Sequence, residues 1–254
     1  LAAHSEKRFA IVRRFPIGPI LAITPFNFPL NLVAHKIAPA IASGNTVVLK
    51  PAPQTPLLAL ILGEIILESG APAGMVNVLP CSNELAEGIV KDERFKMLTF
   101  TGSARIGWYL KSIAGKKKVT LELGGNAGVI IDKTADVNTL VKRIALGSYG
   151  QAGQSCIKVQ RIYVHEDKLG EFKKKFIEET KATKFGDPSN AETIVGPLID
   201  KTAAHRIESW IKEAVDDGAK ILVGGKSNGL VIEPTVLADV KPDMKVFCEE
   251  IFGP

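Results

Sequence analysis

Residues 20–50, ILAITPFNFPLNLVAHKIAPAIASGNTVVLK, contain the pattern that decides the fold. The apolar run over 20–24 predicts a buried strand. Pro29 then opens a predicted helix that runs to about Ala42, with Gly44 at its C-terminal side. The β-branched apolar run over 46–49 predicts a second buried strand. A strand, a connecting helix and another strand in this order indicate two neighbouring strands of a parallel sheet.

The same alternation continues on both sides of this unit. A short strand is expected before it, over 12–15. The elements expected after it are helices over 56–70, 85–90 and 104–113, and strands over 75–79, 97–100 and 119–123. This rhythm predicts a parallel sheet with helices on both faces, in which ligands bind beyond the carboxyl ends of the strands.

A second series of elements begins after Gly124-Gly125, a pair that allows close approach of other backbone. Its expected strands are 129–131, 158–164, 221–223 and 231–236, and its expected helices are 137–147, 168–181 and 202–218. We therefore predict an α/β chain with a domain boundary near Gly124-Gly125.

Composition and charge limit the classes of function. The 254 residues are 46% hydrophobic and 23% charged, which is typical of a globular protein. Thirty-two basic and 27 acidic residues leave a net charge of +5, a mild bias that disfavours nucleic acid as a partner. The lysines at 173–175 lie between Leu169, Phe172, Phe176 and Ile177, which recur at helical spacing, so these lysines are expected largely on a solvated helix face.

The cysteine pattern and the termini bear on compartment and metal binding. Three cysteines without a CxxC or Cys/His cluster favour a reducing compartment over disulfides or a zinc site. A polar N-terminus argues against a signal peptide, and the longest apolar stretch, 57–67, is too short to span a bilayer. We expect a cytoplasmic protein with no metal and no membrane partner. The chain begins without Met and stops at Gly253-Pro254, as a segment of a longer protein would.

Two residues have the side chains and positions of a catalytic pair. Cys156 ends the sequence GQSC on a loop between a predicted helix and strand, where an exposed thiol can be a nucleophile. Glu122 ends an apolar strand, where a buried carboxylate can serve as a general base. A buried structural cysteine and a structural salt bridge are the alternatives. Cys81 and Cys248 are expected to be buried and structural.

Three further positions suit a cofactor or a reacting oxygen. Asn27 follows a strand, and its amide can donate to an oxyanion; a helix N-cap or a turn is the alternative. Gly102 and Ser103 lie between a strand and a helix, as a phosphate-binding turn does, although the spacing is not GxGxxG. Lys50 ends a strand, from which it can reach a ribose or a phosphate; an ordinary strand-end lysine is the alternative.

Together these stretches resemble one family, the NAD(P)-dependent aldehyde dehydrogenases. The matching stretches, in the family's order, are PFNFP (25–29), KPAPQTP (50–56), FTGS (100–103), LELGGN (121–126), GQSC (153–156) and EEIFGP (249–254). The text around residues 14–36 and 153–165 looks most like the lactaldehyde, phosphonoacetaldehyde and non-phosphorylating glyceraldehyde-3-phosphate types.

The resemblance implies an architecture. A Rossmann-type cofactor domain would cover 17–124, a second α/β catalytic domain 125–254, and a remnant of an oligomerisation arm 1–16. The family's full chain is about twice this length, so both domains would be partial. The full-length protein would be a homodimer or homotetramer acting on a small aldehyde.

The resemblance also implies a mechanism. Cys156 would attack the aldehyde, and Asn27 with the backbone N–H of Cys156 would hold the resulting oxyanion. After hydride transfer to the cofactor, Glu122 would activate water to hydrolyse the thioester. Lys36 matches a lysine implicated in proton relay.

NAD or NADP is the implied cofactor. The residues that would contact it are Lys50, Gly102, Ser103, Leu123, Glu250 and Phe252. Many NAD-preferring relatives have a glutamate three residues after the lysine, where this chain has Pro53. Without that carboxylate a 2′-phosphate meets no repulsion, so we expect NADP to be accepted.

Three other classes stay open at this stage. A coenzyme A-acylating aldehyde dehydrogenase would use a thiol in place of water. A cysteine hydrolase or acyltransferase would need a histidine beside Cys156, and the histidines at 4, 35, 165 and 205 lie outside the motifs. A non-catalytic scaffold or nucleic-acid binder is disfavoured by the joint presence of Cys156, Glu122 and Asn27.

Overall fold

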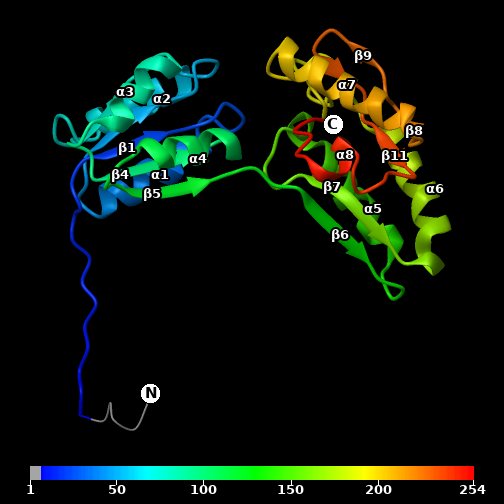
Figure 1. Cartoon of the computed structure of the whole chain (residues 1–254), viewed down its shortest axis with the longest axis horizontal. Coiled ribbons are helices and arrows are strands. Elements are labelled where there is room, and N and C mark those ends of the chain that lie inside the picture. Colours follow the sequence, from blue (N-terminus) through cyan, green and yellow to red (C-terminus); the bar gives the residue numbers. More distant parts are fainter. Residues whose placement is uncertain (1–6) are drawn as a thin grey trace. The chain divides into compact units, whose positions relative to one another are not determined.

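The computed structural model describes residues 7–254, which form two compact units (Figure 1). The first unit ends at Glu122 and the second runs from Leu123 to Pro254. The division thus falls two residues before the predicted boundary at Gly124. Residues 1–6 of the predicted oligomerisation arm lie outside the described residues.

The first unit is built on a five-stranded parallel sheet. Its strands are β1 (Ile20–Ile23), β2 (Val47–Lys50), β3 (Val76–Val78), β4 (Met97–Thr101) and β5 (Lys118–Glu122). Their spatial order is β3-β2-β1-β4-β5, and every neighbouring pair is parallel. This is the strand order of the Rossmann fold, so the predicted parallel sheet is confirmed.

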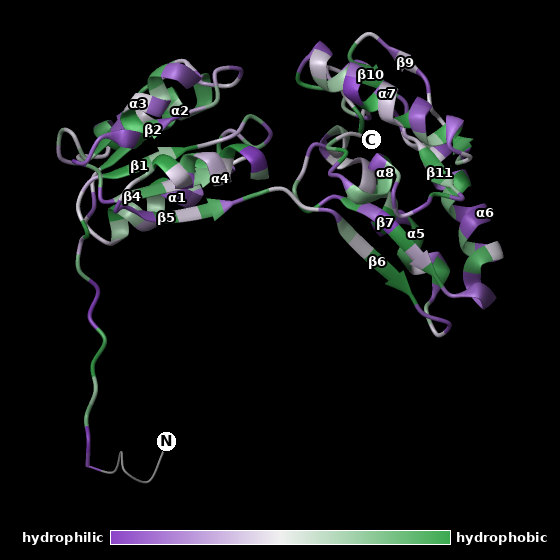
Figure 2. Cartoon of the chain, viewed as in Figure 1, coloured by the Kyte–Doolittle hydropathy of each residue, from purple (hydrophilic) through white to green (hydrophobic). Residues whose placement is uncertain are grey.

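Helices follow the strands of this sheet. They are α1 (Asn31–Ala42), α2 (Leu57–Glu68), α3 (Asn83–Lys91) and α4 (Ala104–Ile113). Side chains of α1 and α2 share one hydrophobic core with alternate residues of β1 and β2, and α3 contacts α4. Figure 2 shows the strands of this sheet as largely hydrophobic. Successive strand residues point to opposite faces, so residues at the strand ends divide between the α1 side and the α3 side.

The second unit combines helices with three small sheets. Its elements are β6 (Ala127–Ile131), α5 (Val137–Tyr149), a 3-10 turn η2 (Gly150–Gly153), β7 (Val159–Val164), α6 (Glu166–Ala182), α7 (Lys201–Asp216), β8 (Lys220–Val223), β9 (Ser227–Asn228), β10 (Val231–Ile232), β11 (Val236–Ala238) and α8 (Lys245–Cys248). β6 pairs with β7 in parallel, whereas β8–β11 and β9–β10 are antiparallel pairs. The main core lies between α5, α6 and α7.

Two predicted strands are wrong. Residues 12–15 form no strand, and Val12 and Phe15 are exposed, because no strand pairs with them and an unpaired strand is not stable. The single strand expected over 231–236 is divided into β10 and β11. Pro234 lies in the break, where it cannot donate a hydrogen bond to a strand ladder.

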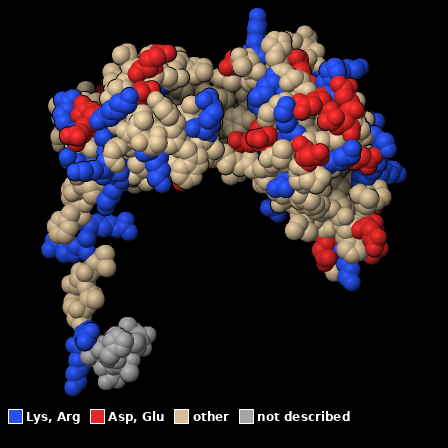
Figure 3. Space-filling model, viewed as in Figure 1, with Lys and Arg blue, Asp and Glu red and all other residues tan. Residues whose placement is uncertain are grey.

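On the face that Figure 3 shows, acidic and basic side chains are interspersed over the second unit. Within residues 7–254, no helix is both long and apolar enough to cross a membrane.

Candidate active site

Asn27 lies in the bend between β1 and α1, at the carboxyl edge of the first unit's sheet. Its side chain is buried. The N-cap of α1 is Leu30, so the interpretation of Asn27 as a helix cap is wrong. A buried carboxamide beyond a central strand fits the position of an oxyanion donor.

Lys36, Thr99 and Glu122 belong to one face of this sheet. The register pairs Thr99 with Thr120 and Thr101 with Glu122, so alternate residues of β4 and β5 point to the same side as α1, which contains Lys36. The Lys36 Nζ donates to Thr99 Oγ1 at 2.9 Å. Burial lowers the pKa of Lys36 to about 8, and the Glu122 carboxylate opposes this shift. The Lys36 amine can therefore release or accept a proton near neutral pH.

Glu122 ends β5, as predicted, but its side chain is exposed. The prediction of a buried carboxylate is therefore wrong. β5 is the edge strand of the sheet, so its outward-facing positions are covered less than those of β1 and β2. An exposed carboxylate at this edge has access to water, which a general base for hydrolysis requires.

Lys50 is the last residue of β2 and is buried. Its Nζ donates to Asn83 Oδ1 at 2.8 Å, and burial lowers its pKa. Pro53 lies in the turn that follows. Lys50 therefore does not face solvent, and its buried ammonium has a specific hydrogen-bond partner.

Residues 100–103 form the predicted strand, turn and helix start. β4 ends at Thr101, the Gly102 N–H donates to the Glu122 carbonyl at 3.0 Å, and Ser103 is the N-cap of α4. A Cβ on Gly102 would meet the Phe100 ring at 2.6 Å. A side chain at this position would have to displace that ring, so glycine fits the turn and leaves the N-terminus of α4 open to an anion.

Cys156 is an exposed, free thiol on the loop after α5, so the alternative of a buried structural cysteine is wrong. The loop turns sharply: Gln151 and Ala152 have φ of 58° and 54°, and Gly153 has φ of 67°. Such strained backbone is typical of functional loops. Cys81 is half-buried and Cys248 is exposed, so the prediction that both are buried is wrong.

Three close contacts hold the Cys156 loop. A Cβ on Gly125 would lie closer than 3.0 Å to the Cys156 carbonyl oxygen. A Cβ on Gly153 would likewise lie closer than 3.0 Å to the Gly253 carbonyl oxygen. The Gln154 side chain accepts a hydrogen bond from the Ile199 N–H at 2.9 Å. Within residues 7–254 the backbone N–H of Cys156 makes no hydrogen bond, which leaves it available to an oxyanion.

Glu250 occupies the space beside the glycine pair. Its Oε1 accepts the Gly125 N–H at 2.9 Å, and a Cβ on Gly124 would overlap its carboxylate. The Lys158 ammonium donates to the Gly253 carbonyl. Burial lowers the pKa of Lys158 to about 8, and the Glu250 carboxylate opposes the shift. The close approach predicted for the glycine pair is thus made by the chain's own Cys156 loop and Glu250.

Sequence reasoning missed the side chains that fix residues 246–254. Gln160 donates to the Val246 and Glu249 carbonyls and accepts from the Ile251 N–H. Asn126 donates to the Phe247 carbonyl at 2.7 Å, and Arg206 to that of Ile251 at 2.8 Å. These contacts join positions 45 to 121 residues apart, and no local pattern signals them. Leu123 and Phe252, predicted cofactor contacts, are half-buried, and Phe252 has a φ of 52°.

Two histidines of the second unit have other contacts. His165 is the N-cap of α6 and accepts the Asp167 N–H, and His205 lies 3.2 Å from Glu208. His35 is exposed on α1 of the other unit, and His4 lies outside the described residues. In the described part of the chain, no group of three or more His, Cys, Asp or Glu side chains is arranged to hold a metal ion.

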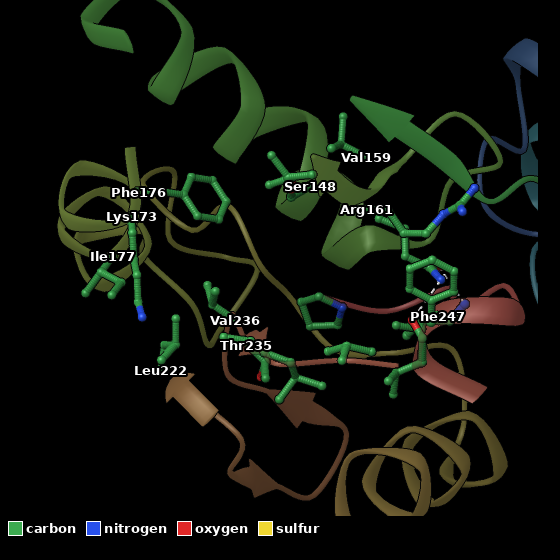
Figure 4. A pocket seen from close by; sticks show the side chains of 18 of the residues that line it. Ser148, Val159, Arg161, Lys173, Phe176, Ile177, Leu222, Thr235, Val236 and Phe247 are labelled. Carbon is green, nitrogen blue, oxygen red and sulfur yellow. Dashed lines mark hydrogen bonds between the residues drawn. The ribbon is translucent and has the colours of Figure 1, made fainter. Parts of the chain in front are cut away.

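The second unit also contains a cavity of about 470 Å³ (Figure 4). Its walls come from α5, β7, α6 and β11 and include Phe176, Ile177 and Val236. Arg161 and Phe247 lie at one end, with the guanidinium 5.0 Å from the ring centre. Cys156 does not line this cavity, and its walls are mainly aliphatic and aromatic, so aldehyde chemistry is not placed there.

Five of the six motifs therefore occupy strand ends, helix starts and a strained loop, and the sixth, over 249–254, is an irregular segment held by distant side chains. This arrangement is typical of a dehydrogenase-like chain with a candidate thiol nucleophile. The chain belongs to the aldehyde dehydrogenase family, which it matches over residues 1–254. The family resemblance and the α/β, Rossmann-type fold class are confirmed.

Individual relatives agree with this assignment. The chain is 46% identical over 254 residues to a 3-sulfolactaldehyde dehydrogenase of Priestia megaterium, covering 100% of this chain and 53% of that protein. Aldehyde dehydrogenase 21 of Physcomitrella patens, in complex with the reaction product succinate, is 52% identical with a TM-score of 0.92, over 94% of this chain and 50% of that one. The glyceraldehyde-3-phosphate dehydrogenase GapN of Methanocaldococcus jannaschii, complexed with NADP, is 41% identical with a TM-score of 0.91, over 95% and 54%. The chain spans about half the length of these relatives.

Proposed function

We propose that this chain contains the catalytic residues of an NAD(P)-dependent aldehyde dehydrogenase that produces a carboxylic acid. The observation that carries the proposal is the Cys156 loop. An exposed thiol is held there by glycine contacts to Gly125 and Gly253, beside Glu250. Such a loop presents a nucleophile in a fixed position, as covalent catalysis requires.

The proposed reaction begins when the Cys156 thiolate forms a C–S bond to the aldehyde carbon. The carbonyl oxygen becomes an oxyanion, which accepts hydrogen bonds from the Asn27 carboxamide and the Cys156 N–H. A bound nicotinamide supplies the hydride acceptor for the oxidation to a thioester. Glu122 then removes a proton from water, the water oxygen attacks the thioester carbon, and the Cys156 sulfur leaves as thiolate.

Lys36 completes the proton path in this proposal. Glu122 must lose the proton that it takes from water before another turnover. The Lys36 amine is on the same sheet face, and its pKa of about 8 leaves a minor fraction of it neutral near pH 7, which can take up that proton. Thr99 holds the amine at 2.9 Å.

The chain's residues fit a dinucleotide cofactor. The sheet has the Rossmann strand order, and Gly102 and Ser103 lead into the N-terminus of α4, where a pyrophosphate can be held. Lys50 would face the adenosine ribose, while Leu123, Glu250 and Phe252 would face the nicotinamide end. The absence of a carboxylate at Pro53 and the NADP complex of GapN favour acceptance of NADP.

The substrate proposed is a short aldehyde of the lactaldehyde, phosphonoacetaldehyde or glyceraldehyde-3-phosphate type. The names of the sulfolactaldehyde and GapN relatives support a small, polar aldehyde. We further propose a homodimer or homotetramer in the cytoplasm, where the free thiols at 81, 156 and 248 would stay reduced.

The test uses the longest natural form of the protein. Nicotinamide reduction is followed with short aldehydes, with NAD and NADP in parallel, without coenzyme A, and with Cys156→Ser beside the wild type. Reduction that the substitution abolishes supports the proposal. A strict requirement for coenzyme A would assign the acylating reaction instead, and activity with NAD alone would contradict the argument from Pro53.

A further inference from the structure

Gln160 is a half-buried residue of β7 that has no part in the proposed reaction. The pairing register of β6 and β7 shifts beside it: Ala127 faces Val159, and the next residue of β6, Gly128, faces Arg161. Gln160 is therefore the extra residue of a β-bulge. A bulge takes a side chain out of the regular alternation of a strand and often lies next to an active site, where it re-aims that side chain.

The Gln160 carboxamide binds the backbone of α8 and of the segment that follows, beside β7 (Figure 1). Its Nε2 donates to the Glu249 carbonyl at 2.7 Å and to the Val246 carbonyl at 3.3 Å. Its Oε1 accepts the Ile251 N–H at 2.9 Å. The Glu249 carbonyl and the Ile251 N–H belong to the two peptide groups that flank Glu250. One side chain therefore holds the backbone on both sides of Glu250.

This double hold matters because residues 249–254 have no regular secondary structure. Backbone polar groups in such a segment need partners other than those of a helix or a strand ladder, and side chains supply them here. Asn126 and Arg206 each bind one carbonyl of this region. Among these three side chains, Gln160 is the one that binds both peptide groups beside Glu250.

The Glu250 carboxylate lies at the glycine pair, where its Oε1 accepts the Gly125 N–H at 2.9 Å. Two cations act on it. Burial lowers the pKa of Arg206, and the Glu250 carboxylate opposes this shift, as it does for Lys158. Coulombic attraction depends on distance and not on direction, so it does not keep the carboxylate on one hydrogen-bond donor. A fixed backbone at Glu250 supplies that direction.

We propose that Gln160 is a positioning residue, which holds Glu250 at the glycine pair and thereby strengthens binding of the nicotinamide end of the cofactor. This inference rests on the proposed dinucleotide cofactor and deepens it, because Glu250 would face the nicotinamide ribose. Gln160 itself would not touch the cofactor. A carboxylate that is held in place before the ligand arrives loses less conformational freedom on binding.

The first test uses the longest natural form of the protein without cofactor. Gln160→Met keeps an unbranched side chain of similar length and removes the three hydrogen bonds. Amide hydrogen exchange at Gly125 should become about tenfold faster, because its acceptor is no longer held. Unchanged exchange at Gly125 in Gln160→Met would overturn the inference.

Thr235→Val is the matched control for lost stability. Thr235 is a half-buried residue of the same unit whose hydroxyl accepts the Gly225 N–H at 3.0 Å and donates to the Glu233 carbonyl at 2.7 Å. Both substitutions should lower the melting temperature, but Thr235→Val should leave exchange at Gly125 and cofactor binding unchanged. Equal acceleration at Gly125 in Thr235→Val would show a general loosening of the unit and overturn the inference.

The second test is a double-mutant cycle of Gln160→Met with Glu250→Ala, in which NADP binding is measured by calorimetry. We expect Gln160→Met to weaken NADP about tenfold when Glu250 is present and less than about twofold in Glu250→Ala. Binding of 5′-AMP, which lacks the nicotinamide end, should change less than about twofold. Equal losses of NADP affinity in both backgrounds, or equal losses for NADP and 5′-AMP, would overturn the inference.

Kinetics separate this inference from the proposed function. NADP binding that follows the expected cycle, in a protein that oxidises no aldehyde, would sustain the inference and remove the proposed function. Aldehyde oxidation in a protein whose two substitutions act additively on NADP affinity would sustain the function and overturn the inference. A wild type that binds neither NAD nor NADP would overturn both.

Discussion

Replacement of Gly125 by alanine tests how the nucleophile is positioned. The added Cβ would lie closer than 3.0 Å to the carbonyl oxygen of Cys156, which is backbone and has no flexible end that can move aside. To restore ordinary contact, the Cys156 backbone must retreat by about 1 Å, and a misplacement of that size costs about a hundredfold in rate. We therefore expect kcat/KM for aldehyde oxidation to fall about a hundredfold.

The assay combines steady-state kinetics with two readouts that do not depend on turnover. Iodoacetamide should still alkylate the exposed Cys156 of Gly125→Ala, because the thiol stays accessible, and thermal unfolding should show a folded protein. Gly170→Ala is the control, since a Cβ there meets nothing within 4 Å, and its kinetics should match the wild type. A Gly125→Ala protein within about threefold of wild-type kcat/KM would refute the positional argument.

Three further predictions concern the proton path, the cofactor side and stability. Thr99→Val removes the acceptor of the Lys36 ammonium, so the Lys36 pKa near 8 should fall and the pH midpoint of thioester hydrolysis should move to lower pH. Thr99→Ser, which keeps the hydroxyl, should retain the wild-type midpoint. An unmoved midpoint in Thr99→Val would exclude a role of Lys36 in the proton path. Lys158 is an ammonium below its pKa of about 8, so wild-type NADP affinity should fall as pH rises through 8 when the charge beside Glu250 is lost. Lys158→Met should weaken NADP binding about tenfold at pH 7 and make the affinity for NADP independent of pH between about 7 and 9. An affinity of Lys158→Met that still falls near pH 8 would contradict this role of Lys158. Gly88→Ala in α3, where a Cβ meets nothing within 4 Å, should raise the free energy of unfolding by about 0.5–1 kcal/mol, and denaturant titration showing a loss would contradict the helix argument.

The first unit could be predicted well from its sequence because its signals are local. The strands over 20–24 and 46–49 are apolar runs bounded by Pro and Gly, and the helix between them has its stop signal at Gly44, which has a φ of 74°. Each strand–helix–strand step has one favoured handedness, so the elements imply the sheet with few alternatives. The strand, turn and helix start around Gly102 are predicted by the same local signals.

The second unit could be predicted less well because its order depends on distant contacts. Residues 249–254 have no regular structure, and their path is set by Gln160 and Arg206, which precede them by tens of residues. The close approaches at Gly124 and Gly125 likewise involve Glu250 and Cys156, which no spacing rule connects to the glycines. Exposure was also hard to predict at edge positions such as Glu122.

The pairing of Lys50 with Asn83 shows the same limit on a smaller scale. Both residues are visible in the sequence as a strand end and a helix start, but their hydrogen bond joins positions 33 residues apart. Only the sheet order brings the ends of β2 and β3, and hence the start of α3, to the same edge. This hydrogen bond is therefore a property of the fold rather than of a motif.

The central claim is that Cys156 forms a thioester that Glu122 clears by activating water. Intact-mass spectrometry of Glu122→Gln, incubated with a short aldehyde and NADP, tests it most directly. The account predicts a stable acyl adduct, mapped to Cys156 by peptide analysis, with one equivalent of reduced nicotinamide formed per protein and little further turnover. Undiminished steady turnover in Glu122→Gln, or reduction of the cofactor with no adduct on Cys156, would contradict the account.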